Sequence, residues 1–179
     1  MISSSNPTIL LVTGASTTRH CYDLLAPLLQ QAGFLTVAVA LPSANPTDPY
    51  EHTAGSDGAS LLEQHLLPLV EAGSDFVVFA HSFGATTLSG ASHHLSKSER
   101  TAMEAPVSQP LWSDPQLEGR RIMIKTLQDA IFALTAQQAF ADSSGVDWQL
   151  REVAGGHEVF LTKSKAVADI VIEVVRSWT

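Results

Sequence analysis

The sequence predicts a doubly wound α/β fold, with a mostly parallel sheet of about five to six strands. Short apolar runs alternate with helical patterns, and these runs cover residues 8–12, 34–41, 76–80, 121–126 and 146–153. The connections between them are short, which is typical of βαβ units whose helices cover both faces of a sheet. The chain has 179 residues, 45% of them hydrophobic, so we expect a single domain over 1–179 with a real core.

The helices are expected between these strands. Apolar spacing predicts them over 20–31, 59–71, 132–141 and 162–178. The last of these should turn five side chains inward, namely Val167, Ile170, Val171, Val174 and Val175. Residues 43–58 contain two prolines and predict a loop, and residues 89–119 contain no segment with a clear strand pattern.

Composition argues against several classes of partner. A net charge of −8 is unfavourable for binding nucleic acid or an anionic membrane. The single cysteine, Cys21, allows no internal disulfide and suits a reducing, cytoplasmic location. The N-terminal residues have no basic segment and only a short apolar run, so neither a signal peptide nor a membrane-spanning helix is expected. No metal-ligand spacing and no G-x-G-x-x-G motif is present, so we expect neither a metal nor a cofactor.

The stretch 75–90 carries the strongest chemical signal. The buried strand 76–80 leads into A-H-S-F-G, with Ser82 at the centre, and a helix-compatible run follows. A serine at a sharp turn from strand to helix is a nucleophile elbow, normally G-x-S-x-G, and Ala80 is the mildest departure from that motif. Small residues are needed because the helix is pressed against the strand. The Phe83 amide and the helix N-terminus would then face an oxyanion beside Ser82.

Two further residues complete a possible catalytic set. Serine needs a base to take its proton, and the base needs a third group to hold it. Asp129 and His157 follow later predicted strands, and Ser…Asp…His is the chain order of the α/β-hydrolases. Taken singly, Asp129 suits a helix N-cap and His157 a surface loop. Their common place at the carboxyl ends of strands favours catalysis.

Two blocks of the sequence resemble a known family, the plant esterase and hydroxynitrile lyase branch of the α/β-hydrolases and related fungal hydrolases. The first block is VTGASTTRHCYDLLAPLLQQAGFLTVAVALPS, and the second is TLQDAIFALTAQQAF…VDWQLREVAGGHEVFLTKSKAVADIVIEV. The resemblance implies that Ser82 is the nucleophile, Asp129 the acid and His157 the base. It further implies an oxyanion hole made by the amides of Ala15 and Phe83. Four residues are expected to line the pocket, namely Gly14, Ser16, His20 and His81.

The chain departs from this family in four respects. Thr13 stands where the family has His, and Ala80 replaces the elbow glycine. Glu158 follows the histidine where the hydroxynitrile lyases have Lys, and a carboxylate does not stabilise departing cyanide. The family also places a strand and a helical cap before its acid, whereas residues 91–119 leave room for only a reduced cap or linker. A missing strand would shift the acid by one strand spacing, about 4.8 Å, and expose a sheet edge that favours a homodimer.

The sequence thus predicts an α/β-hydrolase with a minimal cap. We expect a cofactor-independent serine hydrolase of the esterase type, acting on a small-molecule ester or a related acyl substrate. Two alternatives remain open at this point. One is lyase, cyclase or isomerase chemistry in the same pocket, with His157 as general acid and base. The other is a degenerate member that binds a ligand without catalysis, for which Thr13, Ala80 and the short cap are the motivation.

Overall fold

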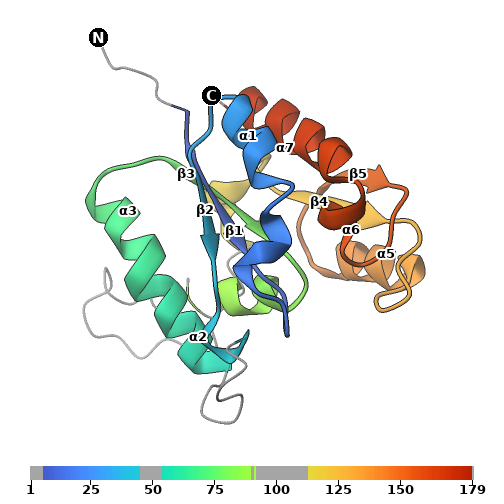
Figure 1. The fold of residues 1–179 in the computed structure, drawn as a ribbon. Coiled ribbons are helices and arrows are strands. Elements are labelled where there is room, and N and C mark those ends of the chain that lie inside the picture. The colour runs from blue at the N-terminus through green and yellow to red at the C-terminus, as the bar shows by residue number, and fades with distance from the viewer. Residues whose placement is uncertain (1–5, 45–53, 90, 92–112, 179) are drawn as a thin grey trace. The chain divides into compact units, whose positions relative to one another are not determined.

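The computed structural model describes residues 6–44, 54–89, 91 and 113–178. The chain divides into two compact units, Met1–Leu111 and Trp112–Thr179, and each unit is described by itself. In both units parallel strands alternate with helices along the chain (Figure 1). The predicted α/β class is therefore confirmed, while the expectation of one domain over 1–179 stays a prediction.

The first unit contains a three-stranded parallel sheet in the order β2-β1-β3. The central strand β1 (Thr8–Val12) is buried along its whole length, which explains its unbroken apolar sequence. It pairs on one side with β2 (Thr36–Val39) and on the other with β3 (Phe76–Ala80). The bounds of β1 and β3 are those predicted, and β2 is shorter than the predicted strand 34–41.

The segment after β1 forms two short helical pieces instead of the single helix predicted for 20–31. A 3₁₀ turn, η1, covers Arg19–Tyr22, and the helix α1 covers Ala26–Gln31. Pro27 lies in the first turn of α1, where its missing N–H costs nothing. A continuous helix would have placed the proline ring against the preceding turn, so the break falls just before it.

The second helix of this unit begins earlier than the prediction of 59–71. It consists of α2 (Ala54–Leu61), a π-helical turn η3 (Leu62–Leu66) and α3 (Leu67–Glu71). The loop predicted for 43–58 is therefore wrong for residues 54–58, and residues 45–53 lie outside the described part. In the π-helical turn the Leu67 amide bonds to the Leu62 carbonyl, five residues back. Pro68, the second residue of α3, follows the turn closely and cannot donate a helical hydrogen bond of its own.

Helices lie on both faces of the three-stranded sheet (Figure 1). Leu10 and Val12 of β1 point to one face, where they pack against Leu61, Leu62 and Leu66 of α2 and η3. Side chains alternate along a strand, so Phe79 of β3 points to the opposite face. There its ring meets Tyr22 of η1 edge-on, with 6.0 Å between ring centroids. The doubly wound arrangement predicted from the sequence is thus present in this unit.

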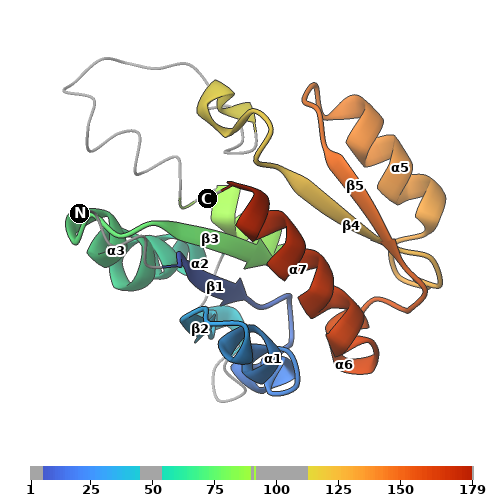
Figure 2. The same ribbon diagram turned by 90° about the horizontal axis from the view of Figure 1, so that it is seen from above.

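The second unit is a βαβα segment. Its strands β4 (Ile122–Thr126) and β5 (Gln149–Val153) are parallel and joined through α5 (Leu134–Ser143). The short α6 (Val159–Thr162) leads into α7 (Ser164–Trp178). The helices α5 and α7 lie on opposite faces of the two strands (Figure 2).

The closing helix buries the side chains that its spacing predicted. Four of the five expected residues of α7 are buried, Val167, Val171, Val174 and Val175, and Ile170 is half-buried. Burying a valine is worth roughly 1.5 kcal/mol or more, so this stripe contributes to the stability of the fold. The strands β4 and β5 begin one and three residues after their predicted starts and end where predicted. The helix α5 is shifted by two residues from the predicted 132–141, and α7 begins two residues after its predicted start.

The predicted reduced cap or linker, 91–119, falls mainly on residues 92–112, which lie outside the described residues. Its described C-terminal part contains the short 3₁₀ turn η5 (Pro115–Leu117), started by the Asp114 side chain bonding to the Gln116 amide. The size of the cap and the placement of the Asp129 strand beside the Ser82 strand stay predictions.

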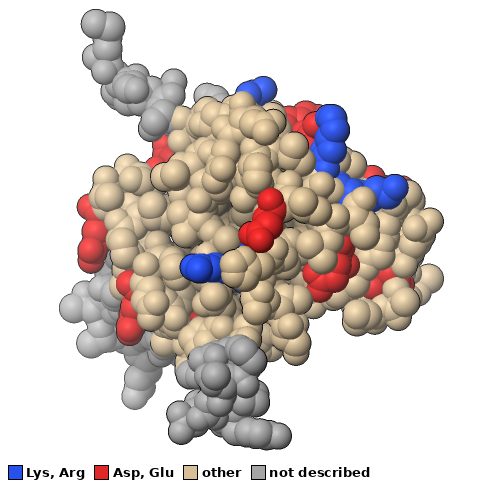
Figure 3. All heavy atoms as spheres, viewed as in Figure 1, with Lys and Arg blue, Asp and Glu red and all other residues tan. Residues whose placement is uncertain are grey.

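Charged side chains are scattered among uncharged ones on the face drawn in Figure 3. In the described part of the chain, no helix combines the length and the apolar character that crossing a membrane requires. The expected cytoplasmic location and the expected homodimer stay predictions.

Candidate active site

Ser82 occupies a strained turn directly after β3. Its φ is +50°, in the left-handed region that costs a residue with a side chain roughly 1–2 kcal/mol. The helix that follows covers residues 83–89, and Ser82 itself is exposed. A strained, exposed serine between a strand and a helix is the geometry of a nucleophile elbow, so the local shape predicted for A-H-S-F-G is present.

Two glycines allow this turn to pack against the end of β1. A side chain at Gly84 would overlap the backbone carbonyl oxygen of Thr13 and lie 3.0 Å from that of Val12. A side chain at Gly14 would lie 2.8 Å from His81 Nδ1 and 3.2 Å from Ser82 Cβ. The loop after β1 therefore touches the serine turn, and only residues without a side chain fit at the two contact points.

The loop after β1 is held by its own hydrogen bonds. Ser16 has a φ of +58°, and the Thr17 hydroxyl donates to the Gly14 carbonyl at 2.9 Å. The Val12 carbonyl accepts from the buried Tyr22 hydroxyl at 2.7 Å and from the His81 amide at 3.1 Å. These bonds tie the loop, the elbow and the first helical turn into one rigid group.

The predicted oxyanion donors, Ala15 and Phe83, belong to the loop and the elbow of this group. Within the described residues, neither amide donates a hydrogen bond to a backbone carbonyl. Phe83 opens the helix 83–89, and the first amides of a helix have no acceptor within it. Unpaired amides next to a nucleophile are what an oxyanion hole requires.

The four predicted pocket residues all lie in the first unit. Gly14 and His81 are in contact, as the glycine geometry shows. Ser16 is exposed in the loop. His20 is exposed as well, and its Nδ1 lies 3.3 Å from Asp23 Oδ2.

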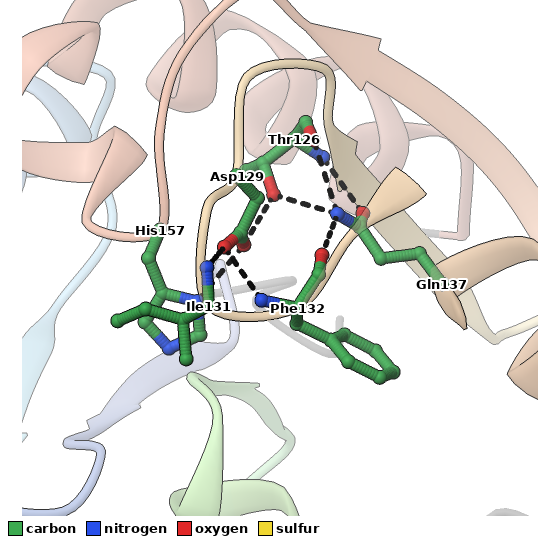
Figure 4. Close-up of polar contacts among 6 residues, drawn as sticks. All are labelled: Thr126, Asp129, Ile131, Phe132, Gln137 and His157. Carbon is green, nitrogen blue, oxygen red and sulfur yellow. Dashed lines mark hydrogen bonds and ion pairs between the residues drawn. The ribbon is translucent and has the colours of Figure 1, made fainter. Parts of the chain in front are cut away.

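Asp129 and His157 form a close pair in the second unit (Figure 4). Asp129 Oδ2 lies 2.9 Å from His157 Nδ1. The Asp129 side chain is 4% exposed and that of His157 is 17% exposed, so water screens the contact only weakly. Asp129 lies five residues before α5, and His157 is mostly buried, so neither a helix N-cap nor a surface loop histidine describes them.

Hydrogen bonds hold the carboxylate of Asp129 in its ionised form. Burial by itself raises the pKa of Asp129, but the Phe132 amide, His157, the Thr126 hydroxyl and the Ile131 amide together lower it to about 2. At Asp129 the hydrogen-bond donors therefore stabilise the negative charge more than burial destabilises it. The acid is therefore ionised throughout the neutral range and attracts a positive charge that develops on His157.

The pKa of Glu158, the residue after the histidine, is shifted in the direction opposite to that of Asp129. Burial raises the pKa of its carboxyl, and attraction to His157 lowers it by a smaller amount. Its Oε2 is buried and has no hydrogen-bond partner among the described residues. A buried carboxyl here differs in charge and in hydrogen bonding from the lysine found in the hydroxynitrile lyases.

The structure thus groups the predicted residues within each unit. Ser82, Gly14, Ala15 and Phe83 gather at the end of β1 and β3 in the first unit, and Asp129 and His157 meet in the second. The meeting of Ser82 with His157 stays a prediction.

Two residues beside the acid were not singled out from the sequence. Thr126 contacts Asp129, and Gln137 contacts Thr126. The available signals were the position of Thr126 at a strand end and of Gln137 as a polar residue on the inward side of a helical pattern.

A strained serine after a strand and a buried Asp–His pair, in an α/β fold, are features expected of a hydrolase. Residues 9–155 of the chain match the Alpha/beta hydrolase family. That match covers most of the 179 residues, and the chain belongs to this family.

Solved structures show the same fold. A pyrethroid hydrolase from Sphingobium faniae JZ-2 is 15% identical with a TM-score of 0.72, covering 95% of this chain and 97% of that one. Polyneuridine aldehyde esterase is 16% identical with a TM-score of 0.67, covering 94% and 99%. An extracellular alpha/beta-hydrolase from a Paenibacillus species is 13% identical with a TM-score of 0.69, covering 94% and 98%. A search of curated proteins found no match. The family and these hydrolase and esterase neighbours together support a hydrolase enzyme.

Proposed function

We propose that the protein is a cofactor-independent serine hydrolase of the esterase type, acting on a small ester or a related acyl substrate. The observation that carries this proposal is the buried 2.9 Å contact between Asp129 Oδ2 and His157 Nδ1. A histidine held at Nδ1 by an ionised carboxylate keeps Nε2 as a base, which is the task of the histidine in a serine triad. The strained turn of Ser82 supports the matching role of nucleophile.

The reaction would proceed through an acyl-enzyme. Ser82 Oγ attacks the carbonyl carbon while its proton passes to His157 Nε2, and the resulting oxyanion accepts hydrogen bonds from the Ala15 and Phe83 amides. The tetrahedral intermediate then expels the alcohol, which takes the proton from His157. Water attacks the acyl-enzyme by the same route in reverse, and releases the acid and free Ser82. Asp129 stays ionised throughout and stabilises the imidazolium.

Buried Glu158 favours ester hydrolysis over cyanohydrin cleavage at this site. A carboxyl group beside the histidine, with a pKa raised by burial, offers no positive charge to a departing cyanide. An ester needs no such charge, because its leaving alcohol takes a proton from His157.

The test is hydrolysis of p-nitrophenyl acetate and p-nitrophenyl butyrate by the wild type and by Ser82→Ala. Turnover should fall by at least about 10³-fold in the variant, since removing a triad nucleophile leaves only residual catalysis. Ser89→Ala is the matched control, because Ser89 lies on the same helix with its hydroxyl bonded to the Ala85 carbonyl. That control should keep both turnover and labelling by a fluorophosphonate.

Mass spectrometry should place the fluorophosphonate adduct on Ser82. A folded wild type that neither turns over the esters nor takes the label would overturn the hydrolase proposal. Non-hydrolytic lyase, cyclase or isomerase chemistry and ligand binding without catalysis would then be separated by analysing the products formed from candidate substrates.

A further inference from the structure

The carboxylate of Asp129 uses all its acceptor positions (Figure 4). Oδ1 accepts from the amides of Ile131 and Phe132, each at 2.8 Å. Oδ2 lies 2.9 Å from the Thr126 hydroxyl and 2.9 Å from His157 Nδ1. Four contacts match the approximately four lone-pair positions of a carboxylate, so its orientation is fully determined by its neighbours.

The side-chain amide of Gln137, on α5, is held by one backbone donor and two backbone acceptors. Its Oε1 accepts from the Thr126 amide at 2.9 Å, and its Nε2 donates to the carbonyls of Thr126 at 3.0 Å and Phe132 at 2.7 Å. An amide N–H can only donate and a carbonyl can only accept, so the two ends of the Gln137 amide cannot be exchanged. The residue is 2% exposed, which keeps water from competing for these bonds.

This fixed orientation is passed on through Thr126. Gln137 Nε2 also lies 3.1 Å from Thr126 Oγ1, and the hydrogen that it directs to the Thr126 carbonyl is shared with that hydroxyl oxygen, because the amide has only two hydrogens and Phe132 takes the other. The Thr126 hydrogen is then directed to Asp129 Oδ2, which can only accept. Because Asp129 offers no hydrogen of its own, His157 must supply one from Nδ1, and Nε2 of the neutral ring is left as the base.

We propose that Thr126 and Gln137 are positioning residues that hold the Asp129 carboxylate in line with His157 Nδ1 through this directed chain of hydrogen bonds, and so strengthen the preference for the tautomer with the proton on Nδ1. The inference rests on the proposed serine-hydrolase function for its catalytic consequence. This series of hydrogen bonds begins at the backbone of β4 and of the loop after it, and it ends at the imidazole of His157. We do not propose that Thr126 or Gln137 contacts the substrate.

The first experiment compares Thr126→Val with Thr126→Ser. Valine has the shape of threonine without the hydroxyl, and Gln137 keeps both of its carbonyl partners, so the fold is expected to survive. Serine restores the hydroxyl without the methyl group. Carbon-13 NMR of the Asp129 carboxyl should show a raised pKa in Thr126→Val, because one donor to the carboxylate is lost, and a value near that of the wild type in Thr126→Ser.

Nitrogen-15 NMR of His157 provides a readout that needs no turnover. The wild type and Thr126→Ser should carry the neutral-ring proton on Nδ1. Thr126→Val should show a measurable fraction with the proton on Nε2, because a carboxylate that has lost one donor is held less firmly in line with Nδ1. The kcat for p-nitrophenyl butyrate should fall about tenfold in Thr126→Val with KM unchanged, since only the base is affected. Thr126→Ser should regain most of that loss.

Gln137→Met is the second variant, with Gln138→Met as its control. Gln138 is the neighbouring residue on the same helix, and its side chain contacts Lys125 and Asp142 instead of Thr126. Lys125 keeps Glu152 as its partner when Gln138 is replaced. We expect the altered His157 tautomer in Gln137→Met and the wild-type tautomer in Gln138→Met.

Wild-type NMR spectra of Asp129 and His157 in both Thr126→Val and Gln137→Met would overturn the positioning role. Failure of the proposed function gives a different result, namely a folded wild type that neither hydrolyses the esters nor takes the label, or ester hydrolysis that survives Ser82→Ala. The tautomer measurement is made on the resting protein, so it decides the positioning role whichever way that test falls.

Discussion

Ser82 in the first unit is placed by backbone packing, whereas Asp129 and His157 in the second unit are placed by side-chain hydrogen bonds. The serine turn depends on two glycines that let main chains touch, and on a φ of +50° that the surrounding structure must enforce. The acid depends on donors that saturate a carboxylate. Packing is sensitive to added volume and insensitive to charge, while the hydrogen-bonded pair responds to a change of one atom and to pH.

The largest expected effect comes from Asp129→Asn. The Ile131 and Phe132 amides require an oxygen where Oδ1 lies, so the new NH₂ group takes the place of Oδ2 and faces His157. His157 Nδ1 must then accept, its proton moves to Nε2, and the base is lost. We expect kcat for p-nitrophenyl butyrate to fall by about 10⁴-fold, as in triads with the wrong tautomer.

The unfolding temperature of Asp129→Asn at neutral pH should fall by only a few degrees, because the stabilised carboxylate is lost while the shape of the side chain is kept. Retention of more than about a tenth of the wild-type kcat would contradict the assignment of Asp129 as the acid.

Gly84→Ala tests the packing side of the comparison. Its methyl group would overlap the Thr13 carbonyl oxygen, which belongs to the backbone and cannot rotate away. We expect the free energy of unfolding, measured in urea, to fall by about 3 kcal/mol. The control is Gly73→Asn, because Gly73 has a φ of +62° that asparagine tolerates and open space around it. Equal stability of the two variants would show that the close approach at the elbow is not needed.

Acid should weaken the second unit through Asp129. The pKa of Asp129 is lowered to about 2 in the folded protein, so its contribution to stability is present above its unfolded pKa and is lost as pH falls through the folded value. A shift of this size corresponds to about 2 kcal/mol. The difference in unfolding free energy between wild type and Asp129→Asn should therefore shrink as pH falls from about 5 to about 2, across the unfolded and folded pKa values of this carboxyl. A difference that is constant with pH would exclude the hydrogen-bonded carboxylate.

Glu158→Gln should have the smallest effect and the opposite sign. Burial raises the pKa of Glu158, so the folded protein loses stability as pH rises from the unfolded pKa through the folded one. The glutamine variant carries no such proton, and its stability should fall less over that rise in pH. Thermal melts of the two proteins at pH 4 and pH 7 make the comparison. A larger loss for the variant than for the wild type would refute a buried carboxyl at this position.

Regular apolar patterns allowed most of the fold to be predicted. The strands 8–12 and 76–80 are almost wholly apolar, the first buried and the second half-buried along its length, and their bounds were correct. The single helix predicted for 20–31 was wrong, because Pro27 favours the first turn of a helix over its interior. The helix predicted from residue 59 begins at 54, where small and polar residues conceal a helical segment.

The sequence by itself determined the α/β class, the strand that carries Ser82, and the chain order of Ser82, Asp129 and His157, because these follow from local pattern and motif. Only the tertiary structure decided that Asp129 Oδ2 meets His157 Nδ1, and that Gln137 reaches back from α5 to Thr126. Those contacts join residues 28 and 11 positions apart in the chain. A hydrogen bond depends on the distance and the direction between two atoms in space. The number of residues between them in the sequence determines neither, because the chain turns between the elements.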